Sequence, residues 1–245
     1  MCTLTVIPRN HGYLLAMNRD ERLTRADAAP PSLVSVGGIA AVYPRDRAGG
    51  TWVAANDRGI ALALLNWNDV SQPDSEKKNS RGAVVTALMR LGSQGEVQKA
   101  LQNLDLLDTW PFRLVGIFPA EKKIGEWRWN HKQLMVEFPE WKPQHWFSSS
   151  LSDERAASER GAACASAWRM EDAGSVAWLR CLHACHDNGP GPFSICVHRE
   201  NVRTVSYTEI ACDANKVSCR YSAGNPCARR DFVGPVEMAR SAINL

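Results

Sequence analysis

Residues 1–22 of the chain read MCTLTVIPRNHGYLLAMNRDER, and this stretch decides the fold. Two apolar segments, residues 3–7 and 13–17, flank Asn10-His11-Gly12, whose residue types suit a tight turn. We therefore expect a β-hairpin. Its second strand ends in the tetrapeptide Asn18-Arg19-Asp20-Glu21, which the hairpin would place beside the beginning of the first strand, at Cys2.

The rest of the chain alternates between groups of strands and pairs of helices. The spacing of apolar residues indicates helices over residues 81–91, 95–104, 153–168 and 175–185. Short apolar segments bounded by turn residues predict strands over residues 39–43, 51–55, 60–67, 113–118, 123–129, 134–138, 146–149, 194–198, 204–210 and 217–222. The proline-rich stretch Ala29-Pro30-Pro31 is interpreted as a loop.

This order of elements predicts an α+β fold. Hairpin-linked strands form antiparallel sheets, and paired helices cover their outer faces. All elements therefore fit a four-layer αββα sandwich of two stacked, mainly antiparallel sheets. No linker is long or polar enough to mark a domain boundary, so residues 1–245 are expected to form a single domain.

Composition and charge exclude several classes of function. Hydrophobic residues make up 44% of the 245 residues and charged residues 22%, as in ordinary globular proteins. The net charge of +3 is too small to indicate a nucleic-acid partner. The chain has no signal-peptide pattern and no run of roughly 20 apolar residues, so we expect a soluble, cytoplasmic protein without an integral membrane segment. Its eight cysteines are then expected to be free thiols.

Cys2 is the candidate nucleophile. Removal of Met1 would leave a thiol and a free α-amine on one residue, which supplies a nucleophile together with its base. Arg19 would lower the pKa of the thiol, and Asp20 would hold the ammonium group. The alternatives are a buried structural cysteine on an edge strand and a surface cluster of charges at residues 18–21.

The motifs resemble those of a known family. Met1-Cys2-Thr3-Leu4 followed by Asn18-Arg19-Asp20-Glu21 is similar to the NRDE family, which includes transport and Golgi organisation 2. Further similar motifs are Gly49-Gly50-Thr51-Trp52, Asn56-Asp57-Arg58-Gly59, Leu65-Asn66-Trp67, Ser80-Arg81-Gly82, Thr204-Val205-Ser206 and Pro226-Cys227. The resemblance is dense in residues 1–82, and it implies roles in haem handling, lipid homeostasis and Golgi organisation.

The same segments resemble, more distantly, the choloylglycine hydrolase and penicillin acylase group of N-terminal-nucleophile (Ntn) hydrolases. That resemblance implies that Cys2 is catalytic, that Arg19 and Asp20 contact it, and that Asn66 is an oxyanion-hole donor. Such a donor stabilises the oxyanion by ~2.7–4 kcal/mol. Ser149 would replace a second asparagine of the group. The other expected substrate-binding residues are Asn18, Trp52, Trp67 and Arg81.

Two functions remain open at this point. The first is a cysteine Ntn amidohydrolase acting on a linear, non-peptide amide with an apolar acyl group. The second is a non-catalytic protein that binds or carries haem or a lipid-like ligand on the same fold. No cofactor is required in either case, haem being a candidate ligand, and no metal site is expected.

The remaining cysteines are expected to be packing residues. Cys181 and Cys185 share a helical face next to His186, but no second pair of ligands accompanies them, which disfavours a zinc site. Metal or redox chemistry there is the weaker alternative. Cys196 and His198 are two residues apart on an expected strand and are not expected to form a catalytic pair.

Overall fold

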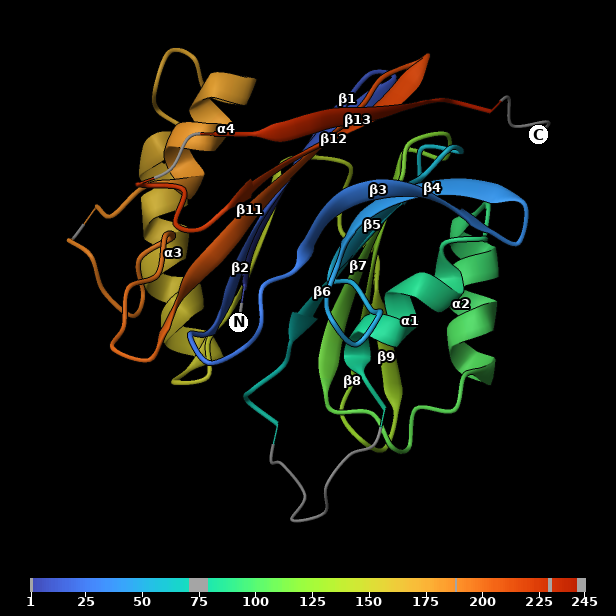
Figure 1. Ribbon diagram of the computed structural model, residues 1–245, viewed down its shortest axis with the longest axis horizontal. Coiled ribbons are helices and arrows are strands. Elements are labelled where there is room, and N and C mark those ends of the chain that lie inside the picture. The colour runs from blue at the N-terminus through green and yellow to red at the C-terminus, as the bar shows by residue number, and fades with distance from the viewer. Residues whose placement is uncertain (1, 71–78, 188, 229–230, 242–245) are drawn as a thin grey trace.

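Two antiparallel sheets stacked face to face form the centre of the computed structural model, which describes residues 2–70, 79–187, 189–228 and 231–241 (Figure 1). The six-stranded sheet has the order β10-β1-β2-β11-β12-β13, and the seven-stranded sheet runs from β3 to β9 in chain order. The first sheet contains β1 (Cys2–Arg9), β2 (Gly12–Arg22), β10 (Gln144–Ser148), β11 (Val202–Cys212), β12 (Lys216–Ala223) and β13 (Val233–Ala239). The second contains β3 (Ala29–Val36), β4 (Ile39–Arg45), β5 (Val53–Asn56), β6 (Ala61–Asn66), β7 (Phe112–Phe118), β8 (Lys123–Trp129) and β9 (Leu134–Glu137).

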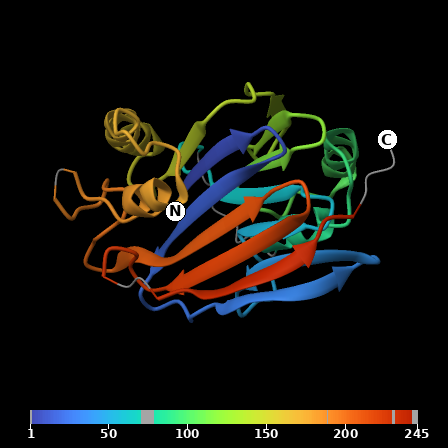
Figure 2. The same ribbon diagram turned by 90° about the horizontal axis from the view of Figure 1, so that it is seen from above.

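A pair of helices covers the outer face of each sheet. The helices α1 (Arg81–Leu88) and α2 (Gln94–Asn103) pack on the seven-stranded sheet, and α3 (Asp153–Ala167) and α4 (Val176–His183) pack on the other (Figure 2). At the starts of α2, α3 and α4, a serine side chain accepts a hydrogen bond from a backbone N–H of the first turn. These bonds satisfy N–H donors that have no partner within the helix. The four-layer αββα prediction is thus confirmed. Within the described residues, no helix is both long and apolar enough to cross a membrane.

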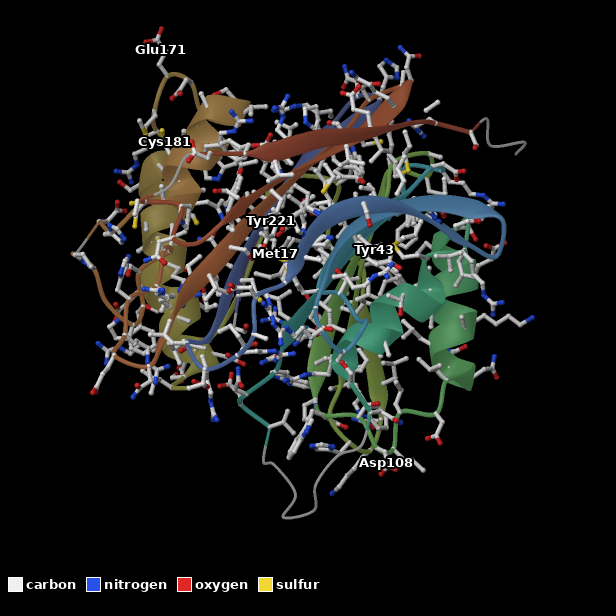
Figure 3. All side chains as sticks on the ribbon, viewed as in Figure 1. Met17, Tyr43, Asp108, Glu171, Cys181 and Tyr221 are labelled. Carbon is white, nitrogen blue, oxygen red and sulfur yellow. The ribbon has the colours of Figure 1, made fainter. Side chains whose placement is uncertain are left out.

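Alternation along the strands sorts side chains between the layers. Leu4 and Val6 of β1 point between the two sheets, whereas Thr3 and Thr5 point toward the helices. The inter-sheet core also contains Met17 and Tyr221, which lie in the centre of Figure 3. Cys2 follows the same alternation and faces the inter-sheet layer.

The β1–β2 hairpin forms as predicted. Its register pairs Cys2 with Arg19 and Thr3 with Asn18. On the other side of β1, Cys2 pairs with Ser148 of β10. Because β1 has a neighbour on both sides, Cys2 does not lie on an edge strand.

Two local predictions were wrong, and one strand was not predicted. Pro30 and Pro31, interpreted as a loop, lie in β3, where an edge strand tolerates a residue without an N–H donor. Residues 194–198 do not form a strand, since only an isolated bridge joins His198 to Arg203. β13 was not predicted because most of its residues are exposed, so it has no apolar alternation.

A chain of hydrogen bonds links the half-buried His145 and the buried His183 behind β1. The Trp168 indole donates to His145 Nε2 at 2.9 Å, and the Thr5 hydroxyl lies 3.0 Å from both His145 Nδ1 and His183 Nε2. An indole only donates, so His145 must carry its proton on Nδ1 and donate to Thr5, which donates to His183. Burial lowers the pKa of His145 to about 4 and that of His183 to about 3, so both are neutral at physiological pH.

Candidate active site

Cys2 is held at the start of β1 with its thiol directed between the sheets. The residue is 6% exposed, and its backbone nitrogen donates to Ser148 Oγ at 2.9 Å. Burial raises the pKa of the Cys2 thiol, although the Asp20 backbone N–H and the Arg19 guanidinium act in the opposite direction. The thiol is therefore neutral at physiological pH and needs a base to become a nucleophile.

Arg19 lies beside Cys2 on the same face of the sheet. It is the cross-strand neighbour of Cys2, and its guanidinium stacks 4.4 Å from the centre of the Trp52 ring. An ion pair of 3.6 Å links Arg19 Nη2 to Glu21 Oε2. The arginine thus presents a positive charge and a stacked indole next to the thiol.

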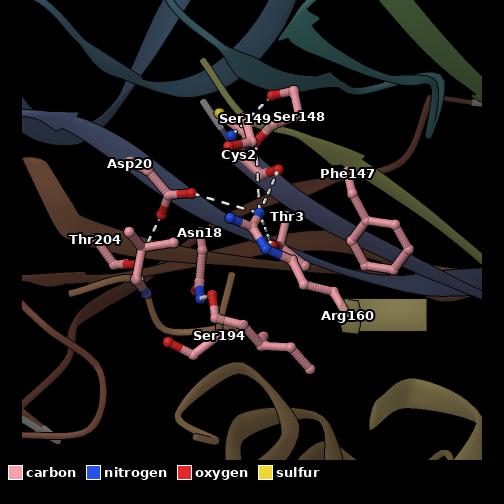
Figure 4. Close-up of polar contacts among 12 residues, drawn as sticks. Cys2, Thr3, Asn18, Asp20, Phe147, Ser148, Ser149, Arg160, Ser194 and Thr204 are labelled. Carbon is pink, nitrogen blue, oxygen red and sulfur yellow. Dashed lines mark hydrogen bonds and ion pairs between the residues drawn. The ribbon is translucent and has the colours of Figure 1, made fainter. Parts of the chain in front are cut away.

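Asp20 points to the opposite face, as alternation along β2 requires. Its Oδ1 accepts a hydrogen bond of 2.7 Å from the Thr204 hydroxyl, and its Oδ2 lies 3.6 Å from Arg160 Nη1 (Figure 4). Burial raises the pKa of this carboxyl, although the Arg160 charge opposes the shift. Asp20 therefore links β2 to β11 and α3 on the side of the sheet that faces away from the Cys2 thiol.

Arg160 of α3 is a site residue that the sequence analysis missed. It is buried, and its Nη1 donates to Thr3 Oγ1 at 2.9 Å and to the Cys2 carbonyl at 3.3 Å (Figure 4). A signal was present, because Ala156, Arg160 and Cys164 recur at a spacing of four residues and form the buried face of α3. A charged residue on such a face needs a partner, which here is Asp20.

We expect Arg160→Met to lower the free energy of unfolding by about 3 kcal/mol at neutral pH, because it removes the buried ion pair between Arg160 and the Asp20 carboxylate. The loss should shrink as the pH falls, since a protonated Asp20 needs no counter-charge. Denaturant titrations at two pH values measure both effects. The control is Arg155→Met on the same helix, whose exposed ion pair with Glu159 contributes at most about 1 kcal/mol. Equal losses in the two variants would contradict the role of Arg160.

The Cys2 thiol opens into a cavity of about 430 Å³ between the two sheets. Asn66, the last residue of β6, lines it, and its carboxamide forms no hydrogen bond with any residue that the structure describes. The lining residues are Cys2, Arg19, Asp20, Glu21, Arg25, Asp46, Ala48, Thr51, Trp52, Leu64, Asn66, Asn79, Ser80, Arg81, Gly82 and Trp110. Most of them are polar or charged.

Two of the cavity's arginines differ in their partners. Arg25 is paired with Glu21 at 2.8 Å and with Asp46 at 3.2 Å. Arg81, the first residue of α1, forms no ion pair with any described residue and donates to the Pro111 carbonyl at 3.2 Å. Burial lowers the pKa of Arg81 to about 10, so it stays charged at physiological pH. Arg81 is the cation available to a bound anion.

A backbone contact between two motifs positions Arg81. Gly50 and Gly82 touch, and the Thr51 N–H points to the Gly82 carbonyl at 3.4 Å. A Cβ on Gly82 would lie 2.9 Å from Thr51 N and 3.0 Å from Thr51 O, which are backbone atoms that cannot rotate away. Glycine at both positions therefore lets the start of α1 approach the segment that carries Trp52.

Gly82→Ala and Gly95→Ala form a matched pair, because each glycine is the second residue of its helix. Helix propensity alone favours alanine by up to ~1 kcal/mol at either site. We expect Gly95→Ala to stabilise the protein, since nothing lies within 4 Å of the new Cβ. Gly82→Ala should instead destabilise it by about 1–3 kcal/mol. Thermal unfolding of the two variants measures the difference, and stabilisation by Gly82→Ala would refute the contact.

Three predicted site residues lie outside the cavity lining. Asn18 faces the helices, where its amide donates to the carbonyls of His183 and Ile195 at 2.8 and 3.0 Å. Trp67 follows the end of β6 and is also absent from the lining. Ser149 lies beyond the end of β10, and its backbone N–H donates a hydrogen bond of 2.5 Å to Asp153 Oδ1. The hydroxyl that accepts a hydrogen bond from the Cys2 nitrogen belongs to Ser148, because the β1–β10 register places Ser148 opposite Cys2.

The sequence model of the family described as transport and Golgi organisation 2 matches residues 1–159. The chain belongs to this family. The match confirms the resemblance that the motifs indicated. No curated protein matches the sequence closely enough to count as a relative.

Solved structures similar to this transport and Golgi organisation 2 family member are Ntn hydrolases. Penicillin V acylase from Agrobacterium tumefaciens matches with a TM-score of 0.52 and 13% identity, over 91% of this chain and 83% of its own. A mutant of the conjugated bile acid hydrolase from Clostridium perfringens matches with a TM-score of 0.54 and 10% identity, over 99% and 97%. At such low identity the likeness shows the fold, which is the αββα sandwich of the Ntn hydrolases.

Proposed function

We propose that the protein is a cysteine Ntn amidohydrolase that cleaves a small linear amide with an apolar acyl group. The observation that carries this proposal is the position of Cys2. It begins a central strand, its thiol faces a cavity, and its nitrogen is held by the Ser148 hydroxyl. A fold shared with acylases and hydrolases supports the same reaction class.

The reaction starts from the chain without Met1. The free α-amine of Cys2, with a pKa of about 8, takes the proton of the neighbouring thiol. The thiolate attacks the amide carbonyl, and the Asn66 carboxamide donates to the oxyanion. The C–N bond then breaks as the ammonium returns its proton to the leaving amine. Water, deprotonated by the same amine, hydrolyses the thioester and restores the thiol.

The cavity lining indicates the kind of substrate. Trp52, Leu64 and Trp110 offer apolar surface to an acyl group, and Arg81 offers a charge without an ion-pair partner among the described residues. Guanidinium groups bind carboxylates with paired hydrogen bonds. We therefore propose that the substrate also carries a carboxylate, which reaches Arg81.

The proposed reaction requires removal of Met1, which gives its direct test. We compare untagged protein, whose Met1 removal is verified by intact mass, with protein carrying an uncleaved N-terminal extension. The extension turns the Cys2 nitrogen into an amide without a basic lone pair, so kcat on a panel of acyl amides, with and without carboxylates, should fall by ~10³-fold or more. Equal turnover in both forms would overturn the proposal.

The control for that comparison is the fold. β1 pairs with β2 through residues 2–9 and with β10 through residues 2–6, so an extension before Cys2 should leave the circular dichroism spectrum and thermal unfolding unchanged. If the extended protein loses structure, the turnover comparison is repeated with the shortest extension, which is a retained Met1 alone.

Binding of haem or a lipid-like ligand is the second candidate function of the same cavity. Arg19 and Arg81 beside Trp52 and Trp110 combine cations with flat apolar rings, which suits a ligand that has carboxylates on an apolar body. A haem titration followed by its absorbance band tests this role. Saturable binding that survives Cys2→Ala, with no amide turnover in the wild type, would favour the carrier function.

A further inference from the structure

Four potential metal ligands from distant parts of the sequence meet at one point beside the six-stranded sheet. They are His186 in the turn after α4, Cys196 and His198 in the following segment, and Cys227 between β12 and β13. One ligand atom of each lies within 4.8 Å of the other three. None of the four lines the cavity that contains Cys2.

The distances within this cluster suit a tetrahedral ion. Cys227 Sγ lies 3.4 Å from His198 Nε2, and Cys196 Sγ lies 3.7 Å from the same nitrogen. In a tetrahedral zinc site with Zn–S of about 2.3 Å and Zn–N of about 2.0–2.1 Å, neighbouring sulfur and nitrogen ligands are about 3.6 Å apart. The rings of His186 and His198 have centroids 4.7 Å apart, so both imidazoles reach the same point.

The fourth ligand supplies an independent observation. His186 Nε2 is buried and forms no hydrogen bond with any residue in the described part of the chain. A buried nitrogen without a hydrogen-bond partner is destabilising unless something else satisfies it. A metal ion among the four side chains would do so.

We propose that His186, Cys196, His198 and Cys227 bind one zinc ion. Two thiolates and two imidazoles form the closed ligand set of a structural zinc site, with no position left for substrate. Binding releases the two thiol protons to solvent and involves no change of oxidation state. The cysteine pair considered from sequence does not contribute, since Cys185 Sγ contacts Asp187 Oδ1 and Cys181 is exposed.

The ion would hold the segment that supports the back of the Asn18-Arg19-Asp20-Glu21 strand. Between two of the ligands, the Ile195 carbonyl accepts from the Asn18 amide, and the Val197 N–H donates to the Thr204 hydroxyl. That hydroxyl in turn donates to Asp20. Cys227 ties the segment to the end of β12, which is separated from it by β11 in the sequence. The zinc therefore fixes the irregular segment to the sheet where regular strand pairing is lacking.

Metal analysis of protein purified without a histidine tag tests the proposal. We expect about one zinc per chain in the wild type and a loss of zinc in Cys196→Ala/Cys227→Ala. The control Cys181→Ala/Cys185→Ala removes two nearby thiols and should keep the zinc. Wild-type protein without bound zinc, or equal zinc in the two double variants, would overturn the assignment.

If the double variant does not fold, metal removal and replacement in the wild-type protein test the same proposal. Chelation of the wild-type ion should lower Tm, and added Zn²⁺ should restore it. Replacement by Co²⁺ should produce the visible absorption of a tetrahedral thiolate complex, weakened in the single variant Cys227→Ser. A Cys196–Cys227 disulfide, detected as a loss of two hydrogens in the intact mass of freshly isolated protein without zinc, would contradict the proposal.

Discussion

Cys2→Ala is expected to reduce kcat/KM for amide hydrolysis by at least ~10³-fold, because the variant lacks the atom that forms the acyl intermediate. The protein should still fold, since alanine preserves the backbone pairing of β1 with β2 and β10. Turnover of the acyl-amide panel, together with covalent labelling of the wild-type thiol, measures the effect. Turnover in Cys2→Ala close to that of the wild type would eliminate Cys2 as the nucleophile.

Cys219→Ala is the matched control for this variant. Cys219 is also a buried thiol of the inter-sheet core, but it does not line the cavity. Burial raises the pKa of its thiol above the ordinary range, so it is chemically inert. We expect Cys219→Ala to keep its turnover and its labelling at Cys2.

The second large effect is a loss of stability in mild acid. His145 and His183 have folded-state pKa values lowered by burial to about 4 and about 3, whereas both take up protons near pH 6.5 when unfolded. Between these values the unfolded chain binds up to two more protons than the folded protein, so stability falls with falling pH. The slope reaches about 2.5 kcal/mol per pH unit near pH 5, and the loss from pH 7.5 to pH 5 is about 4 kcal/mol.

Asp20 affects the pH dependence of stability in the opposite direction to the two histidines, and it contributes at most one proton. Burial raises its folded-state pKa, so its protonation favours the folded protein as the pH falls. The two histidines outnumber it, and the net effect remains destabilising. Protonated His145 would also place an Nε2 proton against the indole N–H of Trp168.

Denaturant titrations between pH 5 and 8 test this prediction. In His145→Gln/His183→Gln the pH slope should fall toward zero, even though the variant is less stable at neutral pH. The control His11→Gln changes an exposed histidine in the β1–β2 turn and should leave the slope unchanged. A slope in the double variant equal to that of the wild type would assign the acid sensitivity to other groups.

Local patterns predicted those parts of the fold in which a segment carries its own signal. The β1–β2 hairpin follows from two apolar segments around a turn, and its register then brings Arg19 to Cys2. The edge strands β3 and β13 carry little such signal. Prolines or exposed residues occupy them, and their pairing depends on neighbours that other parts of the chain supply.

Side-chain direction limited the prediction of the site. The sequence indicated that residues 18–21 lie near Cys2, but alternation sends Asn18 and Asp20 to the helices and Arg19 to the cavity. The same alternation, with the β1–β10 register, selects Ser148 rather than Ser149. A shift of one residue in that register would reverse the choice, and turns or strand ends far along the chain set it.

The sequence by itself determined the family, the layered fold and the pairing of Cys2 with Arg19, because these depend on motifs and on contacts close in the chain. Only the tertiary structure decided that Arg160 supports Cys2 from behind and that Cys196 and His198 meet His186 and Cys227. Both groupings join residues separated by an element or more. Their side chains meet because packing of helices and loops against the sheet brings them together. Local sequence patterns do not predict contacts between residues that are far apart in the chain.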